Sequence, residues 1–237
     1  MDRFLNYGRH QVDDTDVDAV LQVLRSELIT QGPVVERFEA AIAERVGAKY
    51  GIAVNSGTAG LHIACLAAEM DQGSTGITSA ITFAASANAM IYCGAQAKFS
   101  DIDASTISMS SNTLGQAIEA NPESKLVMPV HFAGLATNAE EIKNISDGRV
   151  IVEDAAHAIG GTHETGLPVG NCKFADMVVF SFHPVKPITS GEGGMVLTDD
   201  PELSRRLRLL RNHGIEKSAD LFINQAQAFP DGDEVAQ

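Results

Sequence analysis

The sequence contains no tryptophan and few cysteines, and basic residues are scarce: 17 Lys and Arg stand against 31 Asp and Glu, giving a net charge of −14. Non-specific nucleic-acid binding needs a basic face, so this balance argues against that class of protein. The cysteines, Cys65, Cys93 and Cys172, are widely spaced and form no CxxC pair. An odd, sparse set indicates a reducing compartment without a disulfide framework, so we expect a cytoplasmic protein.

Long hydrophobic runs are also absent. No stretch of 18 apolar residues occurs, and the opening MDRFLNYGRHQVDD has no apolar signal core, so no membrane segment is expected. None of the seven histidines has the spacing of metal ligands, and no metal site is expected. The 237 residues, 44% of them hydrophobic, suffice for a large soluble domain.

Short apolar segments alternate with segments of helical periodicity. Strands are expected at residues 50–55, 97–102, 125–130, 149–154, 176–182 and 194–198. Helices are expected over residues 14–28, 34–47, 61–70, 112–120 and 136–145. This alternation predicts an α/β fold with a mostly parallel sheet between helices, in which the last two strands, close together in sequence, can run antiparallel.

Ligands of such sheets bind beyond the carboxyl ends of the strands. After the first strand, Ser56, Gly57 and Thr58 open a helix, where free N–H groups can seat a phosphate, although Ser56 can equally be a simple helix cap. Asp154 ends a buried apolar strand. A carboxylate there needs a partner, such as a protonated ring nitrogen, unless it is a helix N-cap.

The segment FSFHPVKPITSGEGG, residues 180–194, places Lys186 between Pro184 and Pro187, just after the strand that ends near Ser181. The prolines stiffen the backbone around the lysine. A lysine in a desolvated site can form a Schiff base, although most single lysines lie in exposed loops. A phosphate seat, an acidic strand end and a lysine loop together match the needs of pyridoxal phosphate (PLP).

Seven blocks carry a resemblance to a known family: LITQGPVVERFE, YGIAVNSGTAGLHIA, ITFAASANAMIYCGA, VMPVHFAG, VIVEDAAHAIGG, FSFHPVKPITSGEGGMV and LRNHGI. The chain resembles the DegT/DnrJ/EryC1/StrS sugar aminotransferases over residues 5–225. The resemblance implies a fold type I PLP-dependent transferase, with a seven-stranded sheet in a large domain at 1–225 that includes an N-terminal helical segment, 1–47. Family chains continue into a small C-terminal domain, so we expect that domain to be missing here, with 226–237 a truncated polar tail.

The resemblance also assigns roles to single residues. Lys186 is the expected Schiff-base lysine and proton shuttle, Asp154 the partner of the pyridine nitrogen, and His157 a neighbour of the phenolic oxygen. His157 can instead be a helix residue bonded to backbone. The phosphate is expected at Ser56, Gly57, Thr58 and Ser181. Phe83 is expected against the ring face, with ordinary core packing as the alternative.

Substrate contacts are implied at two further places, and the expected residues are Thr30, Gln31, Gly32, His131 and Phe132. The basic segment 205–214, RRLRLLRNHG, either assists an anionic diphosphate or is a solvated helix face.

The blocks at 79–95 and 180–189 are most similar to the branch of the pseudaminic acid pathway. This implies transamination of a UDP-4-keto-6-deoxy-N-acetylhexosamine at C4, with glutamate as amino donor, by a homodimer of the full-length chain. Two alternatives remain: a truncated, inactive fragment, or a PLP-dependent sugar dehydratase on the same fold. The dehydratase branch commonly replaces the lysine with histidine, so Lys186 favours transamination.

Overall fold

The computed structural model describes residue 8 and residues 10–216. The strands are β1 Tyr50–Val54, β2 Thr75–Ser79, β3 Gln96–Ser100, β4 Leu126–Met128, β5 Val150–Asp154, β6 Met177–Ser181 and β7 Gly194–Thr198. The helices are α1 Asp14–Leu24, α2 Pro33–Val46, α3 Gly57–Ala67, α4 Ala85–Tyr92, α5 Ser111–Ala120, α6 Ala139–Ile145, α7 Pro201–Arg211 and the 3-10 turn η1 Phe132–Gly134. The expected polar tail, 226–237, lies outside the described residues.

The strands form one seven-stranded sheet in the order β1-β7-β6-β5-β4-β2-β3. Strand β7 runs antiparallel to both its neighbours, β1 and β6, and the other pairs are parallel. The predicted mostly parallel α/β sheet is therefore confirmed, and so is the antiparallel end.

One strand was missed in the sequence. Strand β2 reads TGITS, which lacks the apolar run used to identify the others, yet every residue in it is buried. One of its hydroxyls has a backbone partner, because the Thr78 hydroxyl donates to the Met128 carbonyl of β4 at 2.9 Å, whereas Ser79 Oγ has no hydrogen-bond partner among the described residues. A hydroxyl such as that of Thr78 can therefore lie in a buried strand because a backbone acceptor is within reach.

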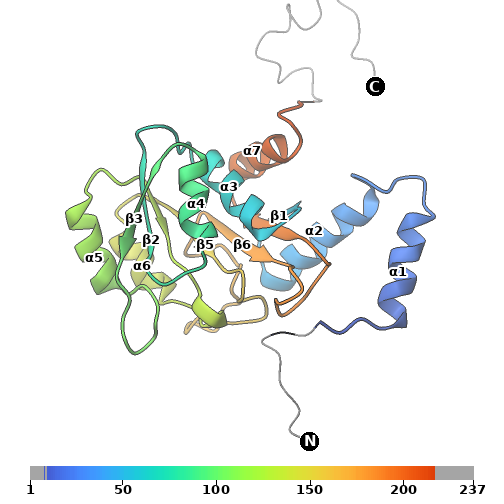
Figure 1. Cartoon of the computed structure of the whole chain (residues 1–237), viewed down its shortest axis with the longest axis horizontal. Coiled ribbons are helices and arrows are strands. Elements are labelled where there is room, and N and C mark those ends of the chain that lie inside the picture. The colour runs from blue at the N-terminus through green and yellow to red at the C-terminus, as the bar shows by residue number, and fades with distance from the viewer. Residues whose placement is uncertain (1–7, 9, 217–237) are drawn as a thin grey trace, which may run out of the picture.

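Helices cover both faces of the sheet (Figure 1). Alternate strand residues separate the two layers: Val179 packs with Leu61 of α3, whereas its neighbour Val178 packs in a second cluster with Val46 of α2. A third cluster joins Ile77 of β2 to α5 and α6. Because both faces are buried, the carboxyl ends of the parallel strands are the place left for a site.

Helix α1 is shorter than the expected 14–28 and ends at Leu24. The N–H of the C-cap residue Arg25 donates to the Leu21 carbonyl. Its start follows the sequence, since Asp13 and Asp16 form a reciprocal capping box. No residue of α1 is buried, and Figure 1 shows the helix set apart from the sheet. The periodicity correctly predicted a helix, but the apolar side chains Val17, Val20, Leu21 and Leu24 that define it are exposed.

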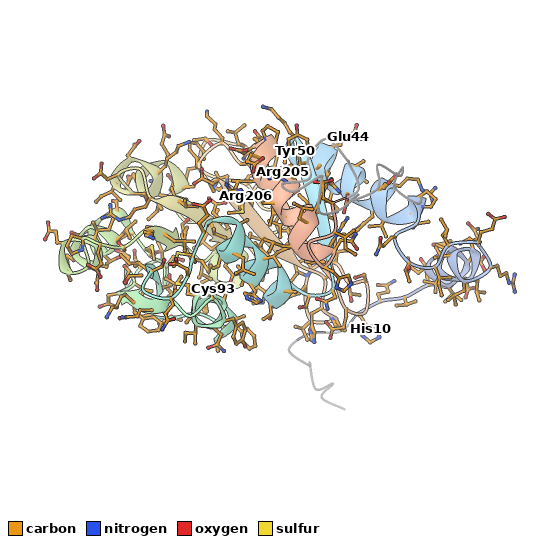
Figure 2. The ribbon with its side chains drawn as sticks, turned by 90° about the horizontal axis from the view of Figure 1, so that it is seen from above. His10, Glu44, Tyr50, Cys93, Arg205 and Arg206 are labelled. Atoms are coloured by element: carbon orange, nitrogen blue, oxygen red, sulfur yellow. The ribbon has the colours of Figure 1, made fainter. Side chains whose placement is uncertain are left out.

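Helix α7 is fastened to the first strand by a buried acid on α2. Glu39 accepts a hydrogen bond from the Ala53 N–H at 2.9 Å and one from Arg208 Nη1 at 2.9 Å, and it also pairs with Arg211. Arg205 and Arg206, labelled in Figure 2, pair with Glu202 of the same helix. The arginines of the basic segment 205–214 therefore form ion pairs with acidic residues of the same chain.

In the described part of the chain, no helix combines the length and the apolar character needed to cross a bilayer. Among the same residues, His, Cys, Asp and Glu side chains form no group of three that could hold a metal ion.

Candidate active site

A cavity of about 470 Å³ opens beyond the carboxyl ends of β5 and β6, beside the N-terminus of α3. Ten residues expected from the sequence line it: Ser56, Gly57, Thr58, Phe83, His131, Phe132, Asp154, His157, Ser181 and Lys186. They come from segments that are far apart in sequence. The parallel topology brings these strand ends to one edge of the sheet.

The N-terminus of α3 forms one wall of this cavity. The Ser56 hydroxyl accepts a hydrogen bond from the Ala59 N–H at 3.1 Å, so the capping role foreseen for Ser56 is present as well. The remaining first-turn N–H groups of a helix have no intrahelical partners. A side chain at Gly57 would put its Cβ 2.8 Å from the Cβ of Ser181, so glycine is required for this wall to lie against β6.

Asp154 supplies the acidic side of the cavity. Its carboxylate is buried and accepts two hydrogen bonds, from Ser86 Oγ at 2.6 Å and from the Ala156 N–H at 3.2 Å. A turn follows β5 here instead of a helix, so Asp154 caps no helix. Its carboxylate is held toward the cavity by specific donors.

Lys186 and His157 meet in the same cavity, with the Lys186 amine in contact with His157 Nε2. Burial lowers the pKa of Lys186, and the Asp154 carboxylate acts in the opposite direction. The pKa of His157 is also lowered, first by burial and then by the charge of Lys186. A neutral imidazole accepting from the lysine, and a larger neutral fraction of that lysine, both favour nucleophilic attack by Nζ on a carbonyl carbon.

Two alternatives considered in the sequence do not match this geometry: core packing for Phe83 and a backbone-bonded helical position for His157. The side chain of Phe83 is 77% exposed while lining the cavity, so it is not a core residue. His157 lies in a turn and its ring contacts Lys186.

The family model of the DegT/DnrJ/EryC1/StrS aminotransferases matches residues 10–229. The chain belongs to this aminotransferase family. The spore coat polysaccharide biosynthesis protein SpsC of Bacillus subtilis is 38% identical over 218 residues, which are 91% of this chain and 55% of SpsC. The chain therefore spans little more than half of that relative.

Solved structures agree with this membership. Helicobacter pylori PseC, an aminotransferase involved in the biosynthesis of pseudoaminic acid, has a TM-score of 0.82 and 32% identity over 90% of this chain and 57% of PseC. The PLP form of the putative sugar aminotransferase Spr1654 from Streptococcus pneumoniae has a TM-score of 0.82 and 28% identity over 90% of this chain and 59% of that chain.

The residues expected from the family resemblance are brought together here, except for three in one segment. Thr30, Gln31 and Gly32 are not among the residues that line the cavity. The Gln31 side chain instead donates to Asn212 Oδ1 at 2.9 Å, just past the end of α7. Their proposed contact with a sugar nucleotide stays a prediction.

Several cavity residues were not singled out from the sequence, among them Thr82, His183, Val185 and Glu192. His183 and Glu192 approach within 4.0 Å across the loop between β6 and β7. In the sequence, the only signal for His183 and Glu192 is that they lie on either side of Lys186. Their approach to each other depends on how the loop folds.

The donor set fits PLP. An amine is available at Lys186, a carboxylate at Asp154, and an anion seat at the start of α3 beside the Ser181 hydroxyl. A Cβ at Gly57 would lie 3.2 Å from Ser181 Oγ, so the absence of a side chain at this position leaves that hydroxyl uncrowded.

A buried polar cluster lies behind the cavity. His131 Nδ1 accepts from the Thr137 N–H at 3.1 Å, which places the ring proton on Nε2, 3.2 Å from Glu153 Oε2 but without the alignment of a hydrogen bond. The His163 ring lies edge-on to His131 at 5.7 Å, and its Nδ1 has no partner among the described residues. Burial lowers the pKa of His163, and Glu153 opposes that shift.

This cluster predicts an acid-sensitive fold. Because the folded-state pKa of His163 lies below its ordinary value of 6.5, the unfolded chain binds the proton more readily. The free energy of unfolding should therefore decrease as the pH is lowered through about 6.5. In His163→Gln this decrease should be smaller than in the wild type. Urea unfolding from about pH 7.5 to about pH 5 measures this. His10→Gln, at an exposed position, is the control. An unchanged pH slope in His163→Gln would contradict the assignment.

Proposed function

We propose that this chain forms the cofactor-binding part, residues 1–225, of a PLP-dependent nucleotide-sugar aminotransferase. The observation that carries the proposal is the convergence of Lys186, Asp154 and the start of α3 on one cavity. Membership of an aminotransferase family and similarity to a structure solved in its PLP form support the same cofactor.

When bound, PLP supplies an aldehyde that bonds to amines and a ring that accepts electrons from the adjacent carbon. The protein's own groups would do the rest. Lys186 Nζ would hold the cofactor and move a proton at the reacting carbon, with His157 as its partner. Asp154 would keep the ring nitrogen protonated, and Phe83 would cover the ring face and exclude water.

For the reaction we propose amination of a UDP-4-keto-6-deoxy-N-acetylhexosamine at C4 with glutamate as donor. Support comes from the similarity to PseC, which is involved in the biosynthesis of pseudoaminic acid, and from the spore coat polysaccharide role of SpsC. We also propose that the full-length enzyme is a homodimer. A cytoplasmic location is consistent with the free thiols of Cys65, Cys93 and Cys172.

The proposal is tested by mixing the purified chain with PLP. We expect an absorbance band near the edge of the visible range that glutamate bleaches and that returns when the keto-sugar nucleotide is added. A chain that gives no such band contradicts the cofactor assignment. A band that no amino donor bleaches contradicts transamination, and deoxygenation of the keto-sugar with pyridoxamine phosphate would identify a dehydratase.

A further inference from the structure

A serine that does not line the cavity makes a short side-chain hydrogen bond to Asp154. Ser86 lies in the first turn of α4, its side chain is fully buried, and its Oγ is 2.6 Å from Asp154 Oδ2. The same oxygen is 2.7 Å from Thr82 Oγ1 and 3.3 Å from the Phe83 carbonyl. Ser86 therefore joins a cavity-lining threonine to the acid.

The direction of these hydrogen bonds follows from the proton count. A carboxylate only accepts, and a serine hydroxyl has one proton to give. At 2.6 Å the carboxylate contact is much shorter than the contact to the Phe83 carbonyl, so the proton goes to Asp154. Ser86 then accepts from Thr82, which makes an ordered series from Thr82 through Ser86 to Asp154.

The two oxygens of Asp154 are held by different segments. Oδ2 accepts from Ser86 of α4, and Oδ1 accepts from the Ala156 N–H that follows β5. Two donors on separate segments fix the torsion of the carboxylate, whereas the backbone donor alone would leave it free to turn. The bond to Ser86 therefore decides which way the carboxylate edge faces.

We propose that Ser86 is the positioning residue for Asp154, orienting the carboxylate toward the ring nitrogen of a bound cofactor, and that Thr82 orients the Ser86 hydroxyl. The inference rests on the proposed function, because it assumes PLP as the ligand. Ser86 acts through Asp154 and touches no ligand itself, since it is not among the residues that line the cavity.

The test compares two buried serines. Ser86→Ala removes the donor to Asp154. Ser79→Ala removes a hydroxyl that is also buried, at the end of β2, and that has no hydrogen-bond partner in the described structure. We expect Ser86→Ala to weaken PLP affinity about tenfold, as for a lost hydrogen bond to a charged group. Ser79→Ala should bind PLP like the wild type.

A second measurement separates positioning from general loosening of the fold. The pH midpoint of the absorbance change of bound PLP should move in Ser86→Ala, by up to about one unit, and stay in place in Ser79→Ala. Ser86→Cys keeps the side-chain shape but offers only a weak donor, so it should also move the midpoint. This variant serves as the test if Ser86→Ala proves unstable.

A double-mutant cycle gives the decisive outcome. In an Asp154→Asn background, Ser86→Ala should cost much less than tenfold in PLP affinity, because the charged acceptor is gone. An undiminished loss there, or a Ser86→Ala protein that binds PLP like Ser79→Ala, overturns the inference while leaving the cofactor assignment intact. A wild-type chain that does not bind PLP overturns both.

Discussion

Replacing Lys186 with alanine is expected to abolish covalent attachment of PLP to this chain. After incubation with PLP and reduction with borohydride, the wild type should carry the cofactor on the peptide that contains Lys186, and the variant should carry none. The physical reason is local: burial lowers the pKa of Lys186, so its amine reacts more readily than that of an exposed lysine. Peptide mass mapping measures the attachment.

The matched control is Lys186→Arg, which keeps a positive charge but cannot bond to the aldehyde. It should hold PLP without covalent attachment. In full-length enzyme, either substitution should also lower amino transfer by about 100- to 10,000-fold, the usual contribution of a positioned proton-transfer group. Equal labelling of another lysine in both variants would contradict the role assigned to Lys186.

Gly194→Ala is expected to give the largest structural effect of any single methyl group added near the site. Gly194 begins β7 and pairs with Val54 on one side and Ser181 on the other. A Cβ there would lie 2.6 Å from the carbonyl carbon and oxygen of Ser56 and 2.8 Å from the Gly57 nitrogen. All three are backbone atoms, so the anion seat itself would have to move. We expect a loss of roughly 3 kcal/mol in unfolding free energy and of most PLP affinity.

The neighbouring Gly193 is the control for this substitution. A Cβ at Gly193 would crowd mainly the Ser190 hydroxyl, the end of a side chain that can rotate away. Gly193→Ala should therefore stay close to wild type in urea unfolding and in PLP affinity. If both alanine variants behave alike, the close contact of β7 with the start of α3 does not shape the site as described.

Much of the fold follows from local sequence signals. Apolar runs predicted six of the seven strands. The end of α2 was predicted at Gly47, which is its C-cap and has a left-handed conformation with φ of 81°. Strand β2 was not predicted because it has no apolar run, and the acceptor of its Thr78 hydroxyl, the Met128 carbonyl, lies on a strand that is distant in sequence. Such pairing cannot be read from residues 75–79 alone.

The candidate site divides in a similar way. Chemistry and topology together led to Lys186, Asp154 and the start of α3, because strand ends of a parallel sheet converge. The contacts that adjust those groups could not be predicted, although the family resemblance already placed His157 in the site. Ser86 is 68 positions from Asp154, and His157 meets Lys186 across 29 positions. These contacts depend on how α4 and the lysine loop fold back over the sheet.

The most direct test of this account is a crystal structure of the chain reconstituted with PLP. We predict the phosphate at residues 56–58, the aldehyde carbon bonded to Lys186 Nζ, and the ring nitrogen within about 2.6–3.2 Å of the Asp154 carboxylate. PLP bound outside the cavity, or a ring nitrogen facing away from Asp154, would contradict the claim that these groups form one cofactor site.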